Sequence, residues 1–398
     1  MRLSASLLVV LACSAAQVSW KHLSSAAADF PAPNPGTQQT ASVVCDFDGD
    51  GLNDFAIGER TAAPAVVWYR RNPSGWVRHV LEAGALRVEA GGACADIDGD
   101  GDPDLVLGGD ARSNEVWWWE NPRPGFDTAR PWVRRAVKNS GATKHHDQIF
   151  GDFDGDGRQE LVFWNQGARK LFLARIPPDP RNAGPWPLIE IYSYSADSEM
   201  LQRGSPAAFR SVNEHEGLAK ADVDGDGRLD IIGGGRWFKH LGGDRFQENL
   251  IDAGYAFSRV AAGQLIRGGR PEIVLVVGDG EGPLVLYEWV KGTWRPRVLL
   301  EKVVNGHSLD VLDFDRDGNL DIFCAEMRLN GGNPDSKAWL LLADGAGGFR
   351  PVVITRGFDH HESRMADLDG DHRHDILGKP YNHQTPRLDI WLNPGAAK

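Results

Sequence analysis

The sequence predicts an all-β fold, a seven-bladed β-propeller, and three observations support this prediction. A nine-residue acidic turn recurs six times along the 398 residues, an apolar strand-like run leaves each copy, and a run that usually carries tryptophan follows. The spacing leaves room for four short strands in each repeat, which is typical of a propeller blade. We therefore expect residues 17–398 to form a single domain of seven blades.

The composition is that of an ordinary globular protein. Hydrophobic residues make up 41% of the chain and charged residues 25%, and the formal net charge is −12. Nucleic acids and anionic membrane surfaces require a basic face, so the acidic balance argues against both as partners. No apolar run in residues 17–398 has the length of a transmembrane helix, and no transmembrane segment is expected.

The first 16 residues have the pattern of a secretory signal peptide. One positive charge, Arg2, precedes a short apolar run that ends in small residues. The pattern predicts a secreted or periplasmic protein.

Carboxylates stand at positions one, three, five and nine of each acidic turn. This arrangement favours Ca²⁺, which prefers six to eight oxygen ligands on a flexible loop, and glycines allow the backbone to curl. A helical EF-hand is excluded because position twelve is never glutamate. The expected calcium ligands are Asp46, Asp48, Asp50 and Asp54; Asp96, Asp98, Asp100 and Asp104; Asp152, Asp154, Asp156 and Glu160; Asp222, Asp224, Asp226 and Asp230; Asp313, Asp315, Asp317 and Asp321; and Asp367, Asp369, Asp371 and Asp375.

Two parts of the ring depart from the regular repeat. The interval from Asp222 to Asp313 is nearly twice that from Asp46 to Asp96, and residues 261–277 keep the strand pattern without the acids. This predicts a further blade that lacks the acidic ligands. The last repeat ends at its third strand, so we expect residues 17–28 to supply the fourth strand and close the ring, which removes an open sheet edge.

Three cysteines follow the signal segment: Cys45, Cys94 and Cys324. An odd number of scattered cysteines is not a disulfide framework. We expect all three to be small buried residues on strands.

The acidic loops and the apolar strands after them resemble the FG-GAP/VCBS repeats of integrin-α-type seven-bladed propellers. The resemblance covers essentially all of residues 17–398. It implies that the loops join the first and second strands of each blade on one face and that calcium there is structural. It does not by itself imply an activity.

Histidines gather before the first strands. Six of the 12 histidines stand six or seven residues ahead of the first aspartate of an acidic turn. A strand of six residues spans about 20 Å, so these histidines should lie on the face opposite the loops. If the first strand is innermost, as the resemblance implies, they should converge near the axis. The six are His145, His146, His215, His307, His360 and His361.

This cluster predicts either a transition-metal site or a general acid–base site. The metal alternative is zinc, bound by His146, His215, His307 and His361. The strands that leave the acidic loops return to the same face and add Lys379, Tyr381 and Glu326 as candidate catalytic residues. The long polar stretch of residues 193–213 leads to the same face and could form a lid.

Two functions fit these features. One is a carbohydrate lyase or dehydratase, in which histidine and tyrosine remove a proton next to a carbonyl or carboxylate. The repeat architecture with pocket histidines is similar to propeller dehydratases and lyases of the aldos-2-ulose dehydratase type. The alternative is a non-catalytic, calcium-stabilised module for glycan binding or adhesion. Both predict a carbohydrate or glycan ligand.

Overall fold

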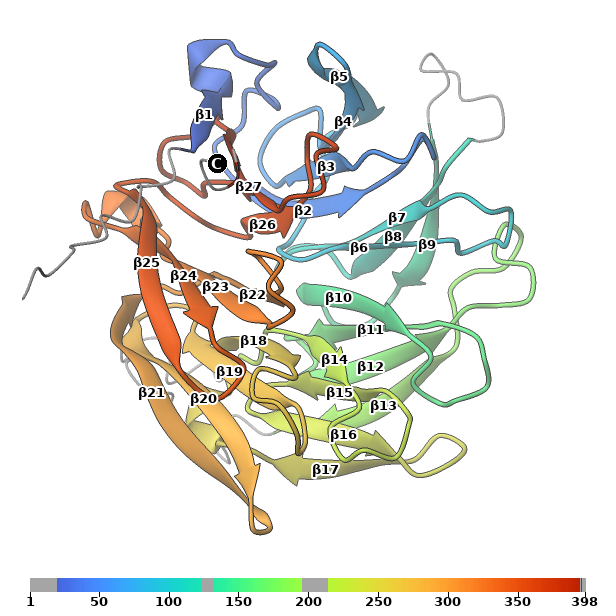
Figure 1. Cartoon of the computed structure of the whole chain (residues 1–398). Coiled ribbons are helices and arrows are strands. Elements are labelled where there is room, and N and C mark those ends of the chain that lie inside the picture. The colour runs from blue at the N-terminus through green and yellow to red at the C-terminus, as the bar shows by residue number, and fades with distance from the viewer. Residues whose placement is uncertain (1–19, 123–131, 195–213, 394, 396–398) are drawn as a thin grey trace, which may run out of the picture.

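The computed structural model consists of seven four-stranded antiparallel sheets around a central axis (Figure 1). It describes residues 20–122, 132–194, 214–393 and 395. The predicted seven-bladed β-propeller is confirmed. Three short 3₁₀ turns accompany the strands: η1 (Ser25–Ala27), η2 (Ala253–Tyr255) and η3 (Leu329–Gly331). Within these ranges, no helix is long and apolar enough to cross a membrane.

Blades one to three each use four strands in chain order. Blade one contains β2 (Gln39–Cys45), β3 (Asp54–Glu59), β4 (Val66–Asn72) and β5 (Gly75–Glu82). Blade two contains β6 (Ala93–Ala95), β7 (Asp104–Gly108), β8 (Glu115–Glu120) and β9 (Val133–Asn139). Blade three contains β10 (His145–Gly151), β11 (Glu160–Asn165), β12 (Lys170–Arg175) and β13 (Leu188–Ser193).

Blades four to six follow the same rule. Blade four contains β14 (Ala219–Ala221), β15 (Asp230–Gly233), β16 (Arg236–His240) and β17 (Phe246–Leu250). Blade five contains β18 (Ser258–Gly263), β19 (Glu272–Val277), β20 (Glu281–Val290) and β21 (Thr293–Val304). Blade six contains β22 (Ser308–Leu312), β23 (Asp321–Ala325), β24 (Lys337–Ala343) and β25 (Phe349–Arg356).

Blade seven combines the two ends of the chain. It contains β26 (Arg364–Ala366), β27 (Asp375–Gly378), β28 (Asp389–Leu392) and, outermost, β1 (Lys21–Ser24). Strand β1 runs antiparallel to β28, with Lys21 opposite Leu392. The N-terminal strand therefore lies in the same sheet as the last three strands, near the C-terminus in Figure 1. The predicted signal peptide, residues 1–16, lies outside the described residues.

The first strand of each blade is the innermost. Contacts join β2 to β6 and β26, β6 to β10, β14 to β18, and β22 to β18 and β26. These strands surround the axis in Figure 1. Residues that precede a first strand or follow a second strand therefore meet at one end of the axis, and the acidic turns lie at the other end.

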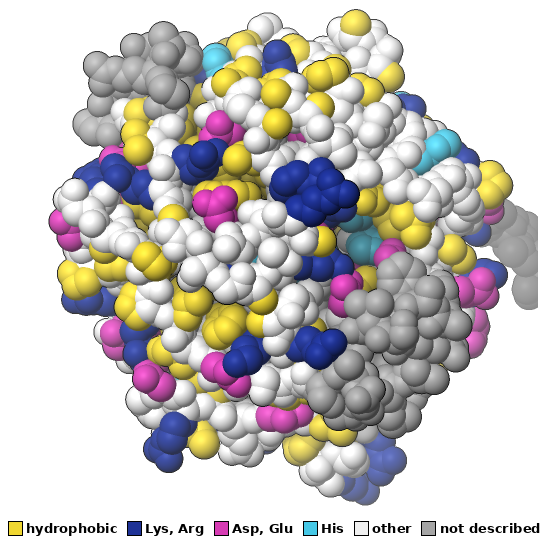
Figure 2. Space-filling model, turned by 180° about the vertical axis from the view of Figure 1, so that it is seen from behind, with side chains coloured by type: hydrophobic (Ala, Val, Ile, Leu, Met, Phe, Trp, Pro, Cys, Tyr) yellow, Lys and Arg dark blue, Asp and Glu magenta, His cyan; other side chains and the backbone are white. Residues whose placement is uncertain are grey.

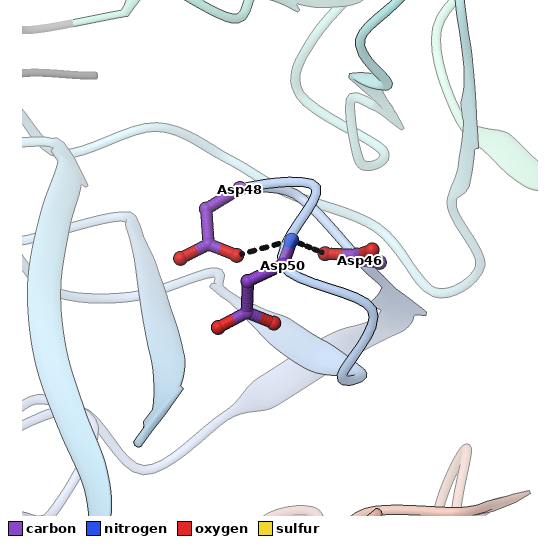
Figure 3. A group of neighbouring side chains, drawn as sticks. All are labelled: Asp46, Asp48 and Asp50. Atoms are coloured by element: carbon purple, nitrogen blue, oxygen red, sulfur yellow. Dashed lines mark hydrogen bonds between the residues drawn. The ribbon is translucent and has the colours of Figure 1, made fainter. Parts of the chain in front are cut away.

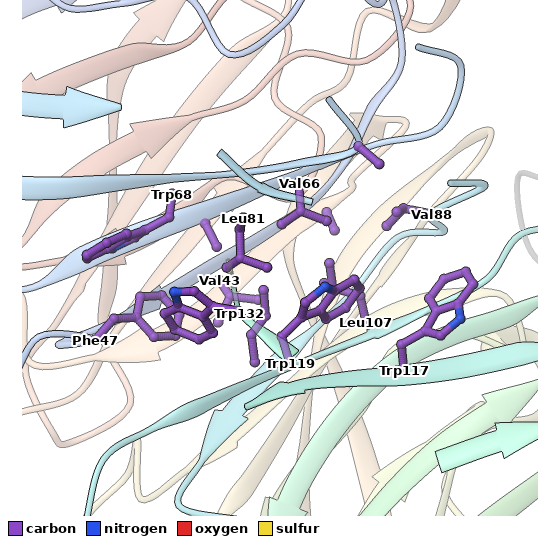
Figure 4. Packing of buried hydrophobic residues seen from close by; sticks show 14 residues of the cluster. Val43, Phe47, Val66, Trp68, Leu81, Val88, Leu107, Trp117, Trp119 and Trp132 are labelled. Atoms are coloured by element: carbon purple, nitrogen blue, oxygen red, sulfur yellow. The ribbon is translucent and has the colours of Figure 1, made fainter. Parts of the chain in front are cut away.

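Apolar and tryptophan side chains fill the spaces between blades. Between blades one and two, Trp68 of β4 packs with Trp132 and Phe47, and Trp119 of β8 belongs to the same cluster (Figure 4). Trp68 and Trp119 are fully buried. Burial of aromatic side chains of this size dominates core stability, so the strand tryptophans hold adjacent blades together.

The carboxylate at position nine of each turn joins the turn to its blade by accepting backbone hydrogen bonds. In blade two, Asp104 accepts hydrogen bonds from Ile97 N–H at 3.0 Å and Asn121 N–H at 2.8 Å. In blade five, Glu272 accepts from Leu265 N–H at 2.9 Å, although the other acids are missing. Blade five therefore keeps the same turn without a cluster of carboxylates, as the strand pattern predicted.

The cysteine prediction was wrong in one respect. Cys45 and Cys94 form a disulfide, whereas Cys324 is free and buried. Cys45 ends β2 and Cys94 lies in β6, so the bond joins the innermost strands of adjacent blades. The two residues occupy nearly equivalent places in consecutive repeats, and the ring brings them together.

Replacing Cys45 and Cys94 with alanine is expected to lower the free energy of unfolding by about 4 kcal/mol. The disulfide closes a loop with a sequence separation of 49, and closing a loop of this length removes about that much entropy from the unfolded chain. Guanidinium unfolding of the oxidised protein and of the variant measures the difference. An equal loss when the unaltered protein is reduced would show that the bond is responsible. A change below about 1 kcal/mol would contradict the assignment.

Candidate functional site

The acidic turns join first and second strands and bring their carboxylates together. In the first turn, the backbone N–H of Asp50 donates to Asp46 Oδ1 at 3.1 Å and to Asp48 Oδ1 at 3.2 Å (Figure 3). In five turns, three acidic residues each offer an oxygen, and these oxygens lie within 4.8 Å of one another. The groups are Asp46, Asp48 and Asp50; Asp96, Asp98 and Asp104; Asp152, Asp154 and Glu160; Asp222, Asp224 and Asp230; and Asp313, Asp315 and Asp321.

These clusters fit a cation. Burial and the neighbouring loop carboxylates raise the pKa of Asp104 to about 8 and that of Asp54 to about 7. Asp224 Oδ1 and Asp313 Oδ1 are buried and accept no hydrogen bond from the described residues. A bound cation would offset the repulsion and satisfy these oxygens. Several acidic clusters could therefore hold metal ions.

A cavity of about 140 Å³ lies at the opposite end of the axis. Figure 2 shows a hollow in which histidine is visible among basic and acidic side chains. All seven blades contribute to the cavity wall. The lining residues used below are Arg60, Glu89, Lys144, His146, Gln166, Glu214, Glu216, Phe257, Asp279, His307, Met327, His361 and Tyr381. We call this cavity the axial pocket.

Three aromatic rings form a continuous stack along one wall of the axial pocket. The ring of His361 lies 4.9 Å from that of His307 and 4.7 Å from that of Tyr381, at interplanar angles of 27° and 26°. Arg60 also lies over the ring of Tyr381, 5.6 Å from the ring centroid, and donates to its hydroxyl at 2.9 Å. The stack fixes the orientation of His361 between two neighbours.

Carboxylates hold two of the imidazoles. His146 places Nδ1 2.7 Å from Asp147 Oδ2 and Nε2 3.2 Å from Glu216 Oε2. His307 places Nε2 2.9 Å from Asp279 Oδ1. Burial alone would lower both pKa values, but the carboxylates outweigh it: they raise the pKa of His146 to about 9 and also raise that of His307. His146 is therefore protonated at neutral pH, and the carboxylate beside His307 favours its protonated form.

His361 has the opposite electrostatic environment. Its Nδ1 lies 2.9 Å from Nζ of Lys379, which also donates to Gln39 O at 2.6 Å. Burial, together with the charges of Lys379 and His307, lowers the pKa of His361 well below the ordinary value. Burial also lowers the pKa of Lys379 to about 7. His361 is therefore neutral at pH 7, next to two imidazoles whose pKa values are raised.

The other predicted site residues lie outside the axial pocket. His145 contacts Gly109 O, and His360 contacts the hydroxyls of Thr355 and Ser363. His215 is buried against Tyr194, with ring centroids 3.8 Å apart. Glu326 accepts hydrogen bonds from the N–H groups of Val304 and Lys337 and from the Asn333 amide. Residues 195–213 of the predicted lid lie outside the described residues.

This placement separates the four residues predicted to bind zinc. His146, His307 and His361 line the axial pocket, but His215 does not. His146 already has a carboxylate at both nitrogens, and the Nδ1 of His361 faces the Lys379 amine. The histidines therefore do not form the convergent four-nitrogen set that was predicted.

Sequence reasoning missed several residues of the axial pocket. Glu89 lies before a first strand, and Arg60 and Asp279 follow second strands. The alignment that found the histidines could have found Glu89 and Glu216 if acidic residues had been included, because they stand seven and six residues before an acidic turn. Arg60 and Asp279 carried no comparable signal.

A family model for FG-GAP-like repeats matches residues 96–163, 152–233 and 268–324. The chain carries FG-GAP-like repeats. The third match begins in blade five, which kept its strands without the acidic turn. No protein with a curated description matches the chain.

Solved structures share the fold at low sequence identity. BBS1N in complex with ARL6DN superposes with a TM-score of 0.55 at 11% identity, covering 95% of this chain and 98% of that one. The exotype rhamnogalacturonan lyase YesX gives a TM-score of 0.48 at 14% identity, covering 90% of this chain and 72% of that one. The V. cholerae biofilm matrix protein Bap1 gives a TM-score of 0.43 at 13% identity, covering 92% of this chain and 69% of that one. At 11% identity the BBS1N match shows a shared fold alone.

Proposed function

We propose that the axial pocket is the active site of a lyase that dehydrates a sugar. The supporting observation is that one small cavity holds imidazoles in opposite surroundings: His146 and His307 contact carboxylates, which raise their pKa values, whereas His361 faces the Lys379 amine and has a lowered pKa. Titratable groups whose environments separate their pKa values are the usual arrangement for paired acid and base catalysis. All three side chains are buried and held by defined partners.

In the proposed reaction, His361 takes a proton from the carbon next to the substrate carbonyl. His307 donates a hydrogen bond to the carbonyl oxygen and stabilises the enolate. His146 then gives its Nε2 proton to the hydroxyl that departs from the adjacent carbon, and this hydroxyl replaces Glu216 as the partner of Nε2. A C–H bond and a C–O bond break, a C=C bond forms, and water leaves. Tyr381, held by Arg60, orients the substrate.

The proposal predicts that replacing His361 with glutamine lowers kcat by about 10²- to 10⁴-fold, the usual contribution of a general base. His383→Gln is the matched control, because His383 lies on the same face but does not line the axial pocket. Circular dichroism checks that both variants are folded. A folded His361→Gln variant with full activity would refute the assignment.

The rate should also fall as the pH rises through about 9. His146 must be protonated to act as the acid, and its pKa is raised to about 9, so its acid form is lost above that value. His146→Gln should remove this alkaline limb as well as lowering kcat. An alkaline limb that persists unchanged in the variant would assign it to another group.

The alternative is a binding module, and the ion pairs of His146 and His307 suit it, because they would also keep a ligand pocket rigid. In that case a sugar would bind to the axial pocket and be recovered unchanged after long incubation. Product analysis by NMR separates the two functions.

We further infer that the acidic turns bind calcium and that the protein is exported. The oxygen-only donor set and the flexible glycine turns suit Ca²⁺. The signal-like residues 1–16 and the Cys45–Cys94 disulfide support export, because disulfides persist mainly in oxidising compartments.

A further inference from the structure

We propose that the axial pocket selects an uncharged sugar and rejects sugar acids; this inference rests on the proposed function. It follows from how the charges of the pocket are paired. A pocket built for a carboxylate or phosphate normally offers an arginine or lysine whose donors are available, often in a bidentate arrangement. The cations of this pocket are already engaged.

Arg60 uses all three of its nitrogens. Nε faces Val88 O at 3.4 Å, Nη1 donates to Tyr381 Oη at 2.9 Å, and Nη2 contacts Glu89. Asp110 adds a second carboxylate 3.6 Å from Nε. An incoming carboxylate could bind this guanidinium only by displacing a buried partner.

The remaining cations are paired in the same way. Lys144 Nζ lies 2.5 Å from Glu214 Oε2, His146 lies between Asp147 and Glu216, and His307 contacts Asp279. Four carboxylates therefore line the axial pocket: Glu89, Glu214, Glu216 and Asp279. Because each cation is already paired with one of these carboxylates, a sugar acid would find no unpaired positive charge and would lie close to like charges, which is unfavourable in a buried site.

The same carboxylates suit the hydroxyl groups of a neutral sugar. Carboxylate oxygens accept hydrogen bonds, and each hydroxyl supplies one donor. Phe257 and Met327 give the wall an apolar part for the C–H face of a sugar ring. The cavity volume of about 140 Å³ is below the roughly 300–1,000 Å³ of sites for drug-sized ligands. The occupant is therefore one small sugar unit, and the carbonyl required for proton removal belongs to a keto group and not to a uronate.

The test compares three methyl glycosides with the same ring: methyl glucoside, its uronate, and the 2-amino analogue. Binding to the full-length protein is measured by calorimetry at pH 7. The neutral glycoside should bind at least tenfold more tightly than the uronate, a difference of about 1.4 kcal/mol. In Glu216→Gln, which removes one pocket carboxylate with little change in volume, this ratio should shrink. Asp244→Asn, an exposed change on blade four, should leave it unchanged.

Each outcome separates the two proposals. Equal or tighter binding of the uronate, tighter binding of the amine, or no binding of any glycoside would overturn the inference. A neutral preference that disappears in Glu216→Gln would support it even if no turnover occurred. Neutral binding without conversion of a keto-sugar would instead refute the lyase function and leave the selectivity intact.

Discussion

A chelator is expected to lower the midpoint of thermal unfolding by about 6–10 °C, because it would remove the calcium that we propose for the acidic turns. Six turns carry several carboxylates each, and without a cation burial and mutual repulsion raise the pKa of Asp230 and Asp375 to about 7. An ion present at 100 times its dissociation constant adds about 2.7 kcal/mol to the free energy of unfolding. Two or three such ions would match much of the 5–15 kcal/mol that stabilises a typical domain.

Differential scanning calorimetry with and without EGTA measures this effect, and re-added Ca²⁺ should restore the midpoint. Mg²⁺ should restore it poorly, because it demands a tighter octahedral shell. Asp313→Asn, in the blade-six turn, should weaken calcium binding, whereas Asp335→Asn changes an exposed acid elsewhere in that blade. An unchanged midpoint in EGTA would show that the turns hold no stabilising ion.

Replacing Arg259 with methionine should produce the other large effect, a loss of about 3–5 kcal/mol in the free energy of unfolding. Arg259 of β18 lies 2.8 Å from Asp147 Oδ1 and 2.6 Å from Glu362 Oε1, and all three side chains are almost fully buried. Removing one partner of a buried ion pair leaves an uncompensated charge, which costs about this much. Here one substitution removes a partner from two buried carboxylates, and each keeps one cation: His146 beside Asp147 and Arg364 beside Glu362.

The position of Arg259 also ties this ion group to the axial pocket. Asp147 and Glu362 directly follow His146 and His361, and both adopt left-handed backbone conformations, with φ of 50° and 58°. Arg259→Lys keeps the charge but not the guanidinium fork, so it should lose less stability than Arg259→Met. Arg245→Met, at an exposed arginine, is the control and should change stability by less than about 0.5 kcal/mol. A small effect of Arg259→Met, matching the control, would contradict the buried-pair account.

The fold was predictable because the acidic turn repeats, whereas the site was predictable only in part. Neighbouring strand residues point in opposite directions, so only one histidine of each pair can face the axis. Pocket residues His146, Glu216, His307 and His361 all stand six residues before an acidic turn. Applied to the sequence, this alternation would have excluded His145, His215 and His360 from the predicted pocket.

Other features depend on how blades meet, which no single repeat encodes. The Cys45–Cys94 disulfide requires the first strands of two blades to be adjacent. Arg60 and Asp279 reach the axial pocket from short segments after second strands, without a recurring motif. Glu326 directly follows a second strand, β23, but backbone N–H groups occupy its carboxylate.

The most direct test of the acid–base pocket is a ¹⁵N NMR measurement of the histidine side chains at pH 7, with signals assigned through His146→Gln, His307→Gln and His361→Gln. The account predicts that His146 is protonated on both nitrogens, that His307 is more protonated than a free imidazole, and that His361 is neutral, because carboxylates raise the first two pKa values and burial lowers the third. If all three imidazoles share one protonation state, the separation of acid and base on which the proposed mechanism depends does not exist.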